Sequence, residues 1–104
     1  MLEEVRKAAS KKILFLPHAL RQMHRIERLI SAAEVYKVIF EGEVIEHYPN
    51  DPRGPSCLVL GKGSEGRTIH VVCAPKQDYL AVITAYLPLK EEWDEQLRER
   101  RKPL

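Results

Sequence analysis

The spacing of apolar residues changes at Gly42, because it is helical before this residue and strand-like after it. Residues 2–10 form either a short amphipathic helix or a frayed terminus. The apolar run at 13–16 is followed by Pro17, which suits the first turn of a helix because it has no N–H to lose. The pattern therefore predicts a helix that begins at Pro17 and includes Arg28.

A second helix is predicted over residues 32–41. Ser31 and Glu34 form a capping box at its start. Gly42 stands where a residue in the left-handed conformation commonly ends a helix. Together with the helix from Pro17, this segment makes up the helical half of the chain.

Four β-rich runs follow, and clusters of Pro, Gly, Asn, Asp and Ser separate them. They span residues 43–49, 55–61, 67–74 and 79–88. Short loops between consecutive runs predict an antiparallel meander. The last run has β-branched and aromatic residues on both faces, so we expect it inside the sheet rather than at its edge.

The residues after Pro88 are predicted to form a short charged helix or a tail, with Trp93 and Leu97 on one apolar line. The expected fold class is α+β, with two N-terminal helices packed on a four-stranded antiparallel sheet and a short C-terminal helix. A length of 104 residues fits a single domain, 1–104.

Composition restricts the function classes only mildly. A net charge of +2 is too small to indicate nucleic-acid binding, so any basic signal must be local. Residues 1–12 carry charges of both signs and no apolar run, so we expect no secretory signal, no membrane association and a cytoplasmic location. Cys57 and Cys73 belong to no CxxC pair. We therefore expect reduced thiols, facing each other on a symmetric hairpin, and no metal or other cofactor.

A cluster of histidines and arginines lies in the first predicted helix, within the stretch HALRQMHRIER. At about 100° per residue, its five members fall within an arc of about 120° on the helix surface. They are His18, Arg21, His24, Arg25 and Arg28. Solvated faces usually mix charges, whereas only Glu27 interrupts this one, and guanidinium groups match phosphates in paired hydrogen bonds. The cluster favours an anionic partner, with an ordinary solvated face as the alternative.

RNA cleavage through an internal 2′-OH needs a base, an acid and a cation at the phosphate, which His, Tyr and Arg can supply. The predicted strands add the candidates His47, Tyr48, His70, Thr84 and Tyr86. We take His18, His70, Thr84 and Tyr86 as the catalytic candidates. The phosphate- or RNA-binding candidates are Arg21, His24, Arg25 and Arg28. The structural alternatives are a buried, hydrogen-bonded role for His70 and an aromatic cap on the core for Tyr86.

Several ordered blocks of the chain resemble the bacterial domain-of-unknown-function 4258 family. They are HALRQM, RLIS, GEVIEHYP, PSCLVLG, IHVVCAP and ITAYLPLKEEW. The resemblance covers roughly residues 15–102 and implies a family-like core over 13–102, preceded by an extension over 1–12. It further implies a small α+β domain akin to the RelE/ParE-like toxins, a group whose members often cut RNA.

By position, the resemblance carries the family's polar residues onto His18, Arg28, His70, Thr84 and Tyr86. The chain also departs from the family. Gln22 stands where an arginine is usual, with Arg21 one position earlier, and the segment 23–31 is about two residues longer.

We therefore expect a toxin-like protein that cleaves or binds RNA without a metal. The alternative is a non-catalytic module that docks an acidic protein or a nucleic acid through the basic helix face. The expected partners are RNA and an acidic, antitoxin-like protein, and the oligomeric state is open.

Overall fold

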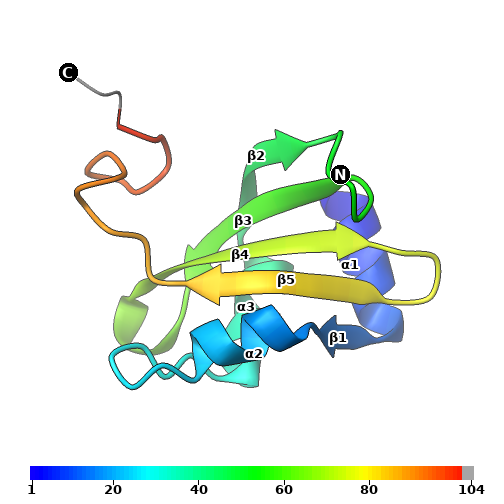
Figure 1. The fold of residues 1–104 in the computed structure, drawn as a ribbon, viewed down its shortest axis with the longest axis horizontal. Helices are drawn as coiled ribbons and strands as arrows, with labels where there is room; N and C mark the ends of the chain where they lie inside the picture. Colours follow the sequence, from blue (N-terminus) through cyan, green and yellow to red (C-terminus); the bar gives the residue numbers. More distant parts are fainter. Residues whose placement is uncertain (102–104) are drawn as a thin grey trace.

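A computed structural model describes residues 1–101, which fold into three helices and one five-stranded mixed sheet (Figure 1). In chain order the elements are α1 (Leu2–Lys11), β1 (Ile13–Phe15), α2 (Pro17–Met23), α3 (Ala32–Glu41), β2 (Glu43–Tyr48), β3 (Ser56–Lys62), the 3-10 turn η1 (Ser64–Gly66), β4 (Thr68–Pro75) and β5 (Leu80–Tyr86). The α+β class is confirmed, but the prediction of two N-terminal helices and four strands misses one of each. No helix within residues 1–101 has the length and apolarity that crossing a membrane requires.

The sheet has the strand order β1-β5-β4-β3-β2. Strands β2 to β5 form the predicted antiparallel meander, because runs joined by short turn-forming loops pair with their neighbours. Cys57 lies opposite Cys73 as expected, and both are buried free thiols. The prediction that the last strand lies inside the sheet is also confirmed.

Strand β1 is the one that the sequence pattern does not predict, and it pairs in parallel with β5 at one edge of the sheet. Ile13 lies opposite Leu80, and the amide of Leu16 donates to the carbonyl of Val82 at 3.0 Å. The sequence pattern predicts the start of a helix after this apolar run, but no strand within it. Three residues are too few to show an alternating pattern, and their partner is the last strand of the chain.

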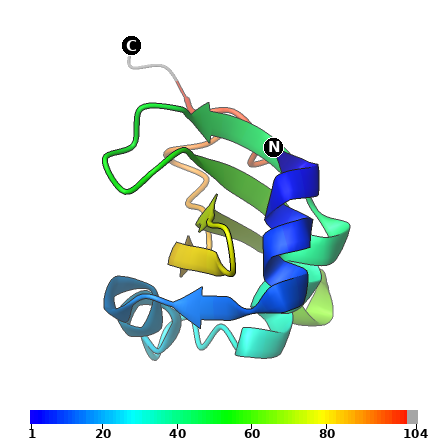
Figure 2. The same cartoon turned by 90° about the vertical axis from the view of Figure 1, so that its right-hand side faces the viewer.

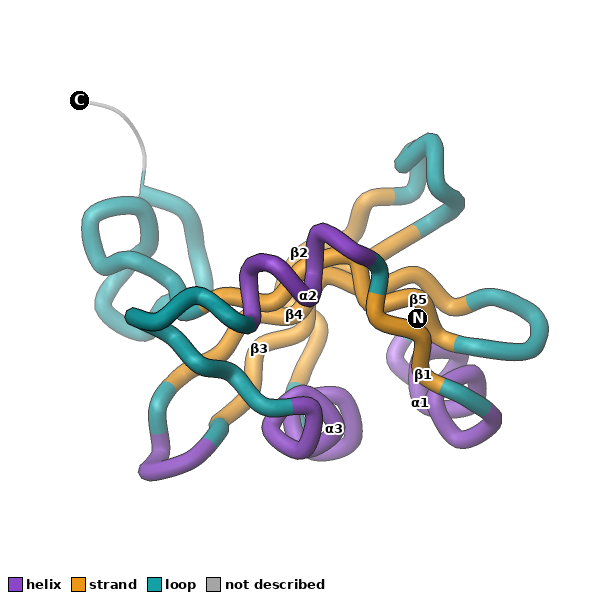
Figure 3. Tube along the Cα trace, turned by 60° about the horizontal axis from the view of Figure 1, so that its bottom comes forward, coloured by secondary structure: helices purple, strands orange, loops and turns teal. Residues whose placement is uncertain are grey.

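Helices α1 and α3 cover one face of the sheet (Figures 2 and 3). The core on this face includes Val5 of α1, Val35 and Val38 of α3, and Val59 and Val71 of the strands, all fully buried. The N-terminal segment is therefore a packed helix rather than a frayed terminus. We call the opposite face of the sheet, which these two helices leave uncovered, the open face.

The helix that begins at Pro17 ends earlier than expected. Helix α2 stops at Met23, and residues 24–31, which we call the basic loop, follow it. Ile30 is 2 % exposed and its amide donates to the carbonyl of Met23, while Leu29 has a φ of 45°. The return of Ile30 to the core turns the chain away from the helix axis. The five basic residues therefore do not share one helix face, and that prediction is wrong.

Residues 88–101 contain no helix, so the predicted C-terminal helix is wrong for this segment, which contacts the open face at His70 through Trp93 and Leu97. Trp93 is 1 % exposed, and its ring contacts the ring of His70 edge-on with 4.5 Å between centroids. Leu97 has a φ of 61°, which a helix does not accommodate. Burial of Trp93 against the sheet therefore outweighs the helical preference of its charged neighbours. The last three positions of the predicted helix lie outside the described residues.

Candidate functional site

Two adjoining hollows lie on the open face and share His18, Thr84 and Tyr86. The first has a volume of about 340 Å³ and is also lined by Gln22, Arg28, Leu87, Leu89 and Glu92. The second has a volume of about 500 Å³ and is also lined by Tyr48, Asp51, Pro52, Arg53, Val72, Ile83 and Arg100. We call the two hollows together the open-face groove.

The shared residues come from two neighbouring elements. His18 is exposed in the first turn of α2, directly after the proline that begins this helix. Thr84 and Tyr86 are two positions apart on β5, so both project to the same side, opposite Val72 and His70 of β4. Strand alternation therefore brings two hydroxyl groups to the open face beside the imidazole.

The first hollow brings together four of the residues predicted from the sequence: His18, Arg28, Thr84 and Tyr86. The other basic residues predicted to join them line neither hollow. Arg21 and His24 are exposed, and Arg25 donates to Glu27 at 2.6 Å on the surface of the basic loop. The early end of α2 explains the separation of His24 and Arg25, because these two residues lie on the basic loop and no longer follow the helix periodicity.

His70 is fully buried below the groove. Its Nε2 lies 2.7 Å from the carbonyl oxygen of Leu97, which only accepts, so Nε2 carries the proton and donates. The Nδ1 atom is then an acceptor for the Tyr86 hydroxyl at 3.3 Å. Burial lowers the pKa of His70, which keeps the ring neutral. His70 therefore orients Tyr86 and does not line the groove.

Tyr86 donates its hydroxyl proton to His70, so the lone pairs of its oxygen are available to a donor in the groove. Burial raises the pKa of Tyr86 and keeps the phenol protonated. Tyr48 lines the second hollow, and burial together with the Glu46 carboxylate raises its pKa to about 12. Both phenols are therefore neutral hydrogen-bonding groups at neutral pH.

Arg28 is the cation of the first hollow. Its Nη1 donates to the uncharged Oε1 of Gln22 at 2.9 Å, and no carboxylate within residues 1–101 forms an ion pair with it. The arginines of the second hollow are paired, Arg53 with Asp51 and Arg100 with Glu46. An arginine at position 22 would repel Arg28, whereas the amide oxygen of Gln22 accepts a hydrogen bond from it.

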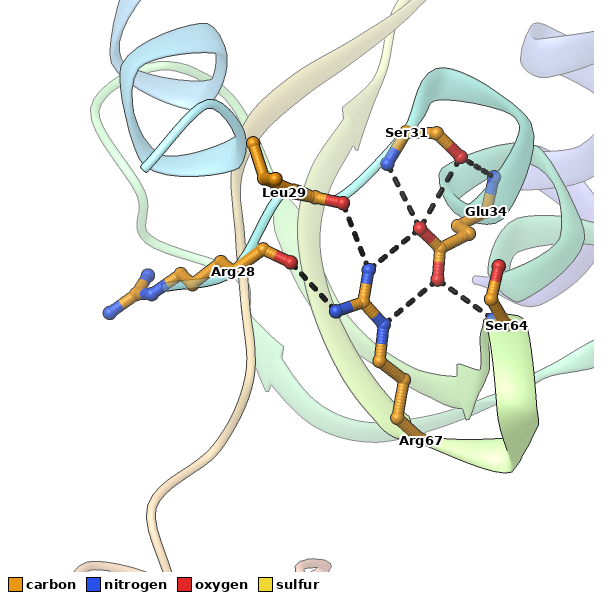
Figure 4. A network of polar contacts seen from close by, with 6 residues as sticks. All are labelled: Arg28, Leu29, Ser31, Glu34, Ser64 and Arg67. Carbon is orange, nitrogen blue, oxygen red and sulfur yellow. Dashed lines mark hydrogen bonds and ion pairs between the residues drawn. The ribbon is translucent and has the colours of Figure 1, made fainter. Parts of the chain in front are cut away.

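The position of Arg28 depends on a cluster of polar contacts that the sequence analysis did not find (Figure 4). Arg67 donates to both carboxylate oxygens of Glu34 and to the backbone carbonyls of Arg28 and Leu29. Hydrogen bonds from Arg67 lower the pKa of Glu34 to about 2. Glu34 was recognised only as part of a helix cap. The structure buries Glu34 beside the apolar residues of α3, which the spacing of the cap alone does not indicate.

The comparisons with known proteins identify a family. Residues 15–87 match the domain of unknown function DUF4258. No curated protein and no solved structure matches the chain. Within residues 1–101, no three His, Cys, Asp or Glu side chains gather in a way that could hold a metal ion. Because the matched residues span well over half of the sequence, the chain belongs to the DUF4258 family.

Proposed function

We propose that this protein binds single-stranded RNA in the open-face groove and cleaves it without a metal ion. The observation that carries the proposal is the presence of an exposed imidazole, from His18, and of a guanidinium that forms no ion pair within residues 1–101, from Arg28, in one hollow. This role also follows the kinship with RelE/ParE-like ribonucleases that the ordered sequence blocks imply. The kinship alone would be analogy, since one fold hosts many functions.

The residues of the first hollow divide the chemistry among them. Arg28 binds the non-bridging phosphate oxygens, because its planar donors match a phosphate. Thr84 donates a hydrogen bond from the floor of the groove, and Tyr86, whose hydroxyl already donates to His70, accepts one from a donor group of the RNA. His18 accepts the proton of the 2′-OH, whose oxygen attacks phosphorus while the bond to the 5′ oxygen breaks. The 5′ oxygen takes a proton from water, and the products are a 2′,3′-cyclic phosphate and a 5′-OH.

Glu92 is the carboxylate among the residues of the first hollow. Its negative charge opposes phosphate binding, so Glu92→Gln is expected to tighten RNA binding. The same variant would lower the cleavage rate if the carboxylate takes part in proton transfer. Measuring affinity and rate together separates these two effects.

The test is incubation of the purified protein with 5′-labelled single-stranded RNA in EDTA. We expect cyclic-phosphate products from the unsubstituted protein and from His24→Ala, an exposed control outside the groove, and none from His18→Ala. Arg28→Ala should weaken binding by about tenfold, the effect of losing a charge-assisted hydrogen bond. Equal products from His18→Ala and the unsubstituted protein would exclude the catalytic proposal.

A second candidate function is docking of an acidic, antitoxin-like protein without catalysis. The observation in its favour is the exposure of Ile26 and Leu29, 88 % and 63 %, on the basic loop beside Arg28. Exposed apolar groups within a basic surface suit a partner with apolar and acidic side chains. This candidate predicts intact RNA in the assay above. It also predicts amide shift changes at Ile26 and Leu29 when an acidic, leucine-containing peptide is added.

A further inference from the structure

The contacts of the basic loop assign a role to two residues outside the groove. We infer that the ion pair between Arg67 and Glu34 is a positioning device for Arg28, which it holds in place for RNA phosphates. The inference rests on the proposed function, because it concerns how that site is kept in its binding geometry. Neither Glu34 nor Arg67 contacts the RNA in the proposed complex.

The Glu34 carboxylate forms the centre of the cluster. It is 8 % exposed and accepts from the Ser31 amide at 3.0 Å, from the Ser64 amide at 2.8 Å and from Arg67 at 2.8 and 3.0 Å. A helix cap needs only the contact with Ser31. The additional donors, Ser64 and Arg67, connect the start of α3 to the turn before β4. The two hydrogen bonds to the carboxylate also fix the guanidinium of Arg67.

Arg67 connects the Glu34 carboxylate to the backbone of the basic loop. Its Nη1 and Nη2 donate to the carbonyls of Arg28 and Leu29 at 2.7 and 3.0 Å. Leu29 has a φ of 45°, a left-handed conformation that is unfavourable for a leucine. The loop keeps this conformation because the contacts around it are stronger than the local preference.

The side chain and the backbone of Arg28 point in different directions. Figure 4 shows its backbone carbonyl turned towards Arg67 and its guanidinium extending away from the cluster. The guanidinium lines the first hollow, where it donates a hydrogen bond to the side chain of Gln22 on α2. Arg28 is therefore fixed through both its backbone and its side chain, which lowers the entropy lost when it binds a phosphate.

The first test uses substitutions for which simple electrostatics and positioning predict opposite results. Glu34→Gln removes a negative charge near the groove, so electrostatics alone predicts unchanged or tighter RNA binding. Arg67→Lys keeps the positive charge, but an ammonium lacks the planar fork that reaches a carboxylate and two carbonyls. Positioning predicts that each variant binds a fluorescent 2′-O-methyl RNA about tenfold more weakly. The control is Glu65→Gln, an exposed carboxylate of η1 outside the cluster, which should not weaken binding.

The second test is a double-mutant cycle with Arg28→Gln. If Glu34 acts through Arg28, then Glu34→Gln should cause no further loss of affinity once Arg28 is replaced. A purely structural role would weaken binding by the same factor in both backgrounds. Unchanged or tighter binding of Glu34→Gln, or the same tenfold loss in the Arg28→Gln background, would overturn the inference.

Amide hydrogen exchange separates this inference from the proposed function. Exchange at Leu29 and Ile30 should accelerate in Glu34→Gln and Arg67→Lys, whereas Val38 in the core of α3 should stay protected and report an intact fold. Unchanged exchange at Leu29 and Ile30 would overturn the inference whatever the RNA result. Faster exchange together with no RNA binding by the unsubstituted protein would overturn the proposed function and support the positioning of the loop.

Discussion

At the scale of single residues, the ordinary chemistry of each side chain is changed by one or two neighbours. Within residues 1–101, Arg28 has an amide partner and no ion pair with a carboxylate, so its charge is available to a ligand. His70 is neutral because it is buried, and Tyr86 is fixed because His70 accepts a hydrogen bond from its hydroxyl group. Glu34 is ionised to low pH because Arg67 donates to it. Arg28 and Tyr86 therefore line the groove, whereas His70 and Glu34 support residues that line it.

Glu34 gives a prediction at this scale. Its pKa is lowered to about 2 in the folded protein from an ordinary value of 4.5, so its stabilising effect is fully present above pH 4.5 and is lost as the pH falls towards 2. Glu34→Gln should therefore lower the free energy of unfolding at pH 7 by up to about 3 kcal/mol. The difference from the unsubstituted protein should shrink steadily in urea unfolding at pH 4 and pH 2.5. A difference that is constant over this range would contradict the assignment.

At the scale of elements, close backbone approach decides how α3 lies on the sheet. A Cβ at Gly61 of β3 would lie 2.9 Å from the Cα of Val38, so the helix can pack here only against a glycine. The capping box fixes the start of α3 at Ala32, as predicted. Helix α2 and strand β1 were harder to predict, because the end of one and the pairing of the other depend on residues distant in sequence.

Gly61→Ala tests this packing. The added methyl group forces α3 away from β3, and we expect a loss of roughly 2–3 kcal/mol in the free energy of unfolding by urea. Gly66→Ala is the comparison, because its φ is 73° but no atom lies within 4 Å of the new Cβ. That variant should lose only about 1 kcal/mol, the cost of a left-handed alanine. A Gly61→Ala loss no larger than the Gly66→Ala loss would show that the helix adjusts freely.

At the scale of the whole molecule, contacts between neighbouring elements can be predicted from the sequence better than contacts between distant segments. The meander, the facing cysteines and the cap of α3 all follow from signals within a few residues. Of the site, His18, Arg28, Thr84 and Tyr86 were predicted and lie in one hollow. The Arg67–Glu34 ion pair was not predicted, because two residues 33 positions apart that pair only through the fold leave no pattern in the sequence. The path of residues 88–101 was missed because it depends on burial of Trp93.

Trp93 provides the prediction for this long-range contact. Its ring covers His70, and burial lowers the pKa of that histidine, so the protein should lose stability as the pH falls below about 6.5. The unfolded chain binds a proton there that the folded chain does not. Trp93→Leu should expose the imidazole, raise the pKa of His70 in an NMR titration and reduce this pH dependence of stability. An unchanged His70 titration would mean that Trp93 does not shield the ring.

The central claim is that the open-face groove is the surface that binds RNA. A ¹H–¹⁵N NMR titration with a short 2′-O-methyl RNA tests it directly, because this ligand keeps the phosphates but cannot be cleaved. We predict the largest amide shift changes at His18, Arg28, Thr84 and Tyr86, with the changes disappearing as salt is raised. Changes confined to α1 and its lysines, or no changes at low salt, would contradict the claim.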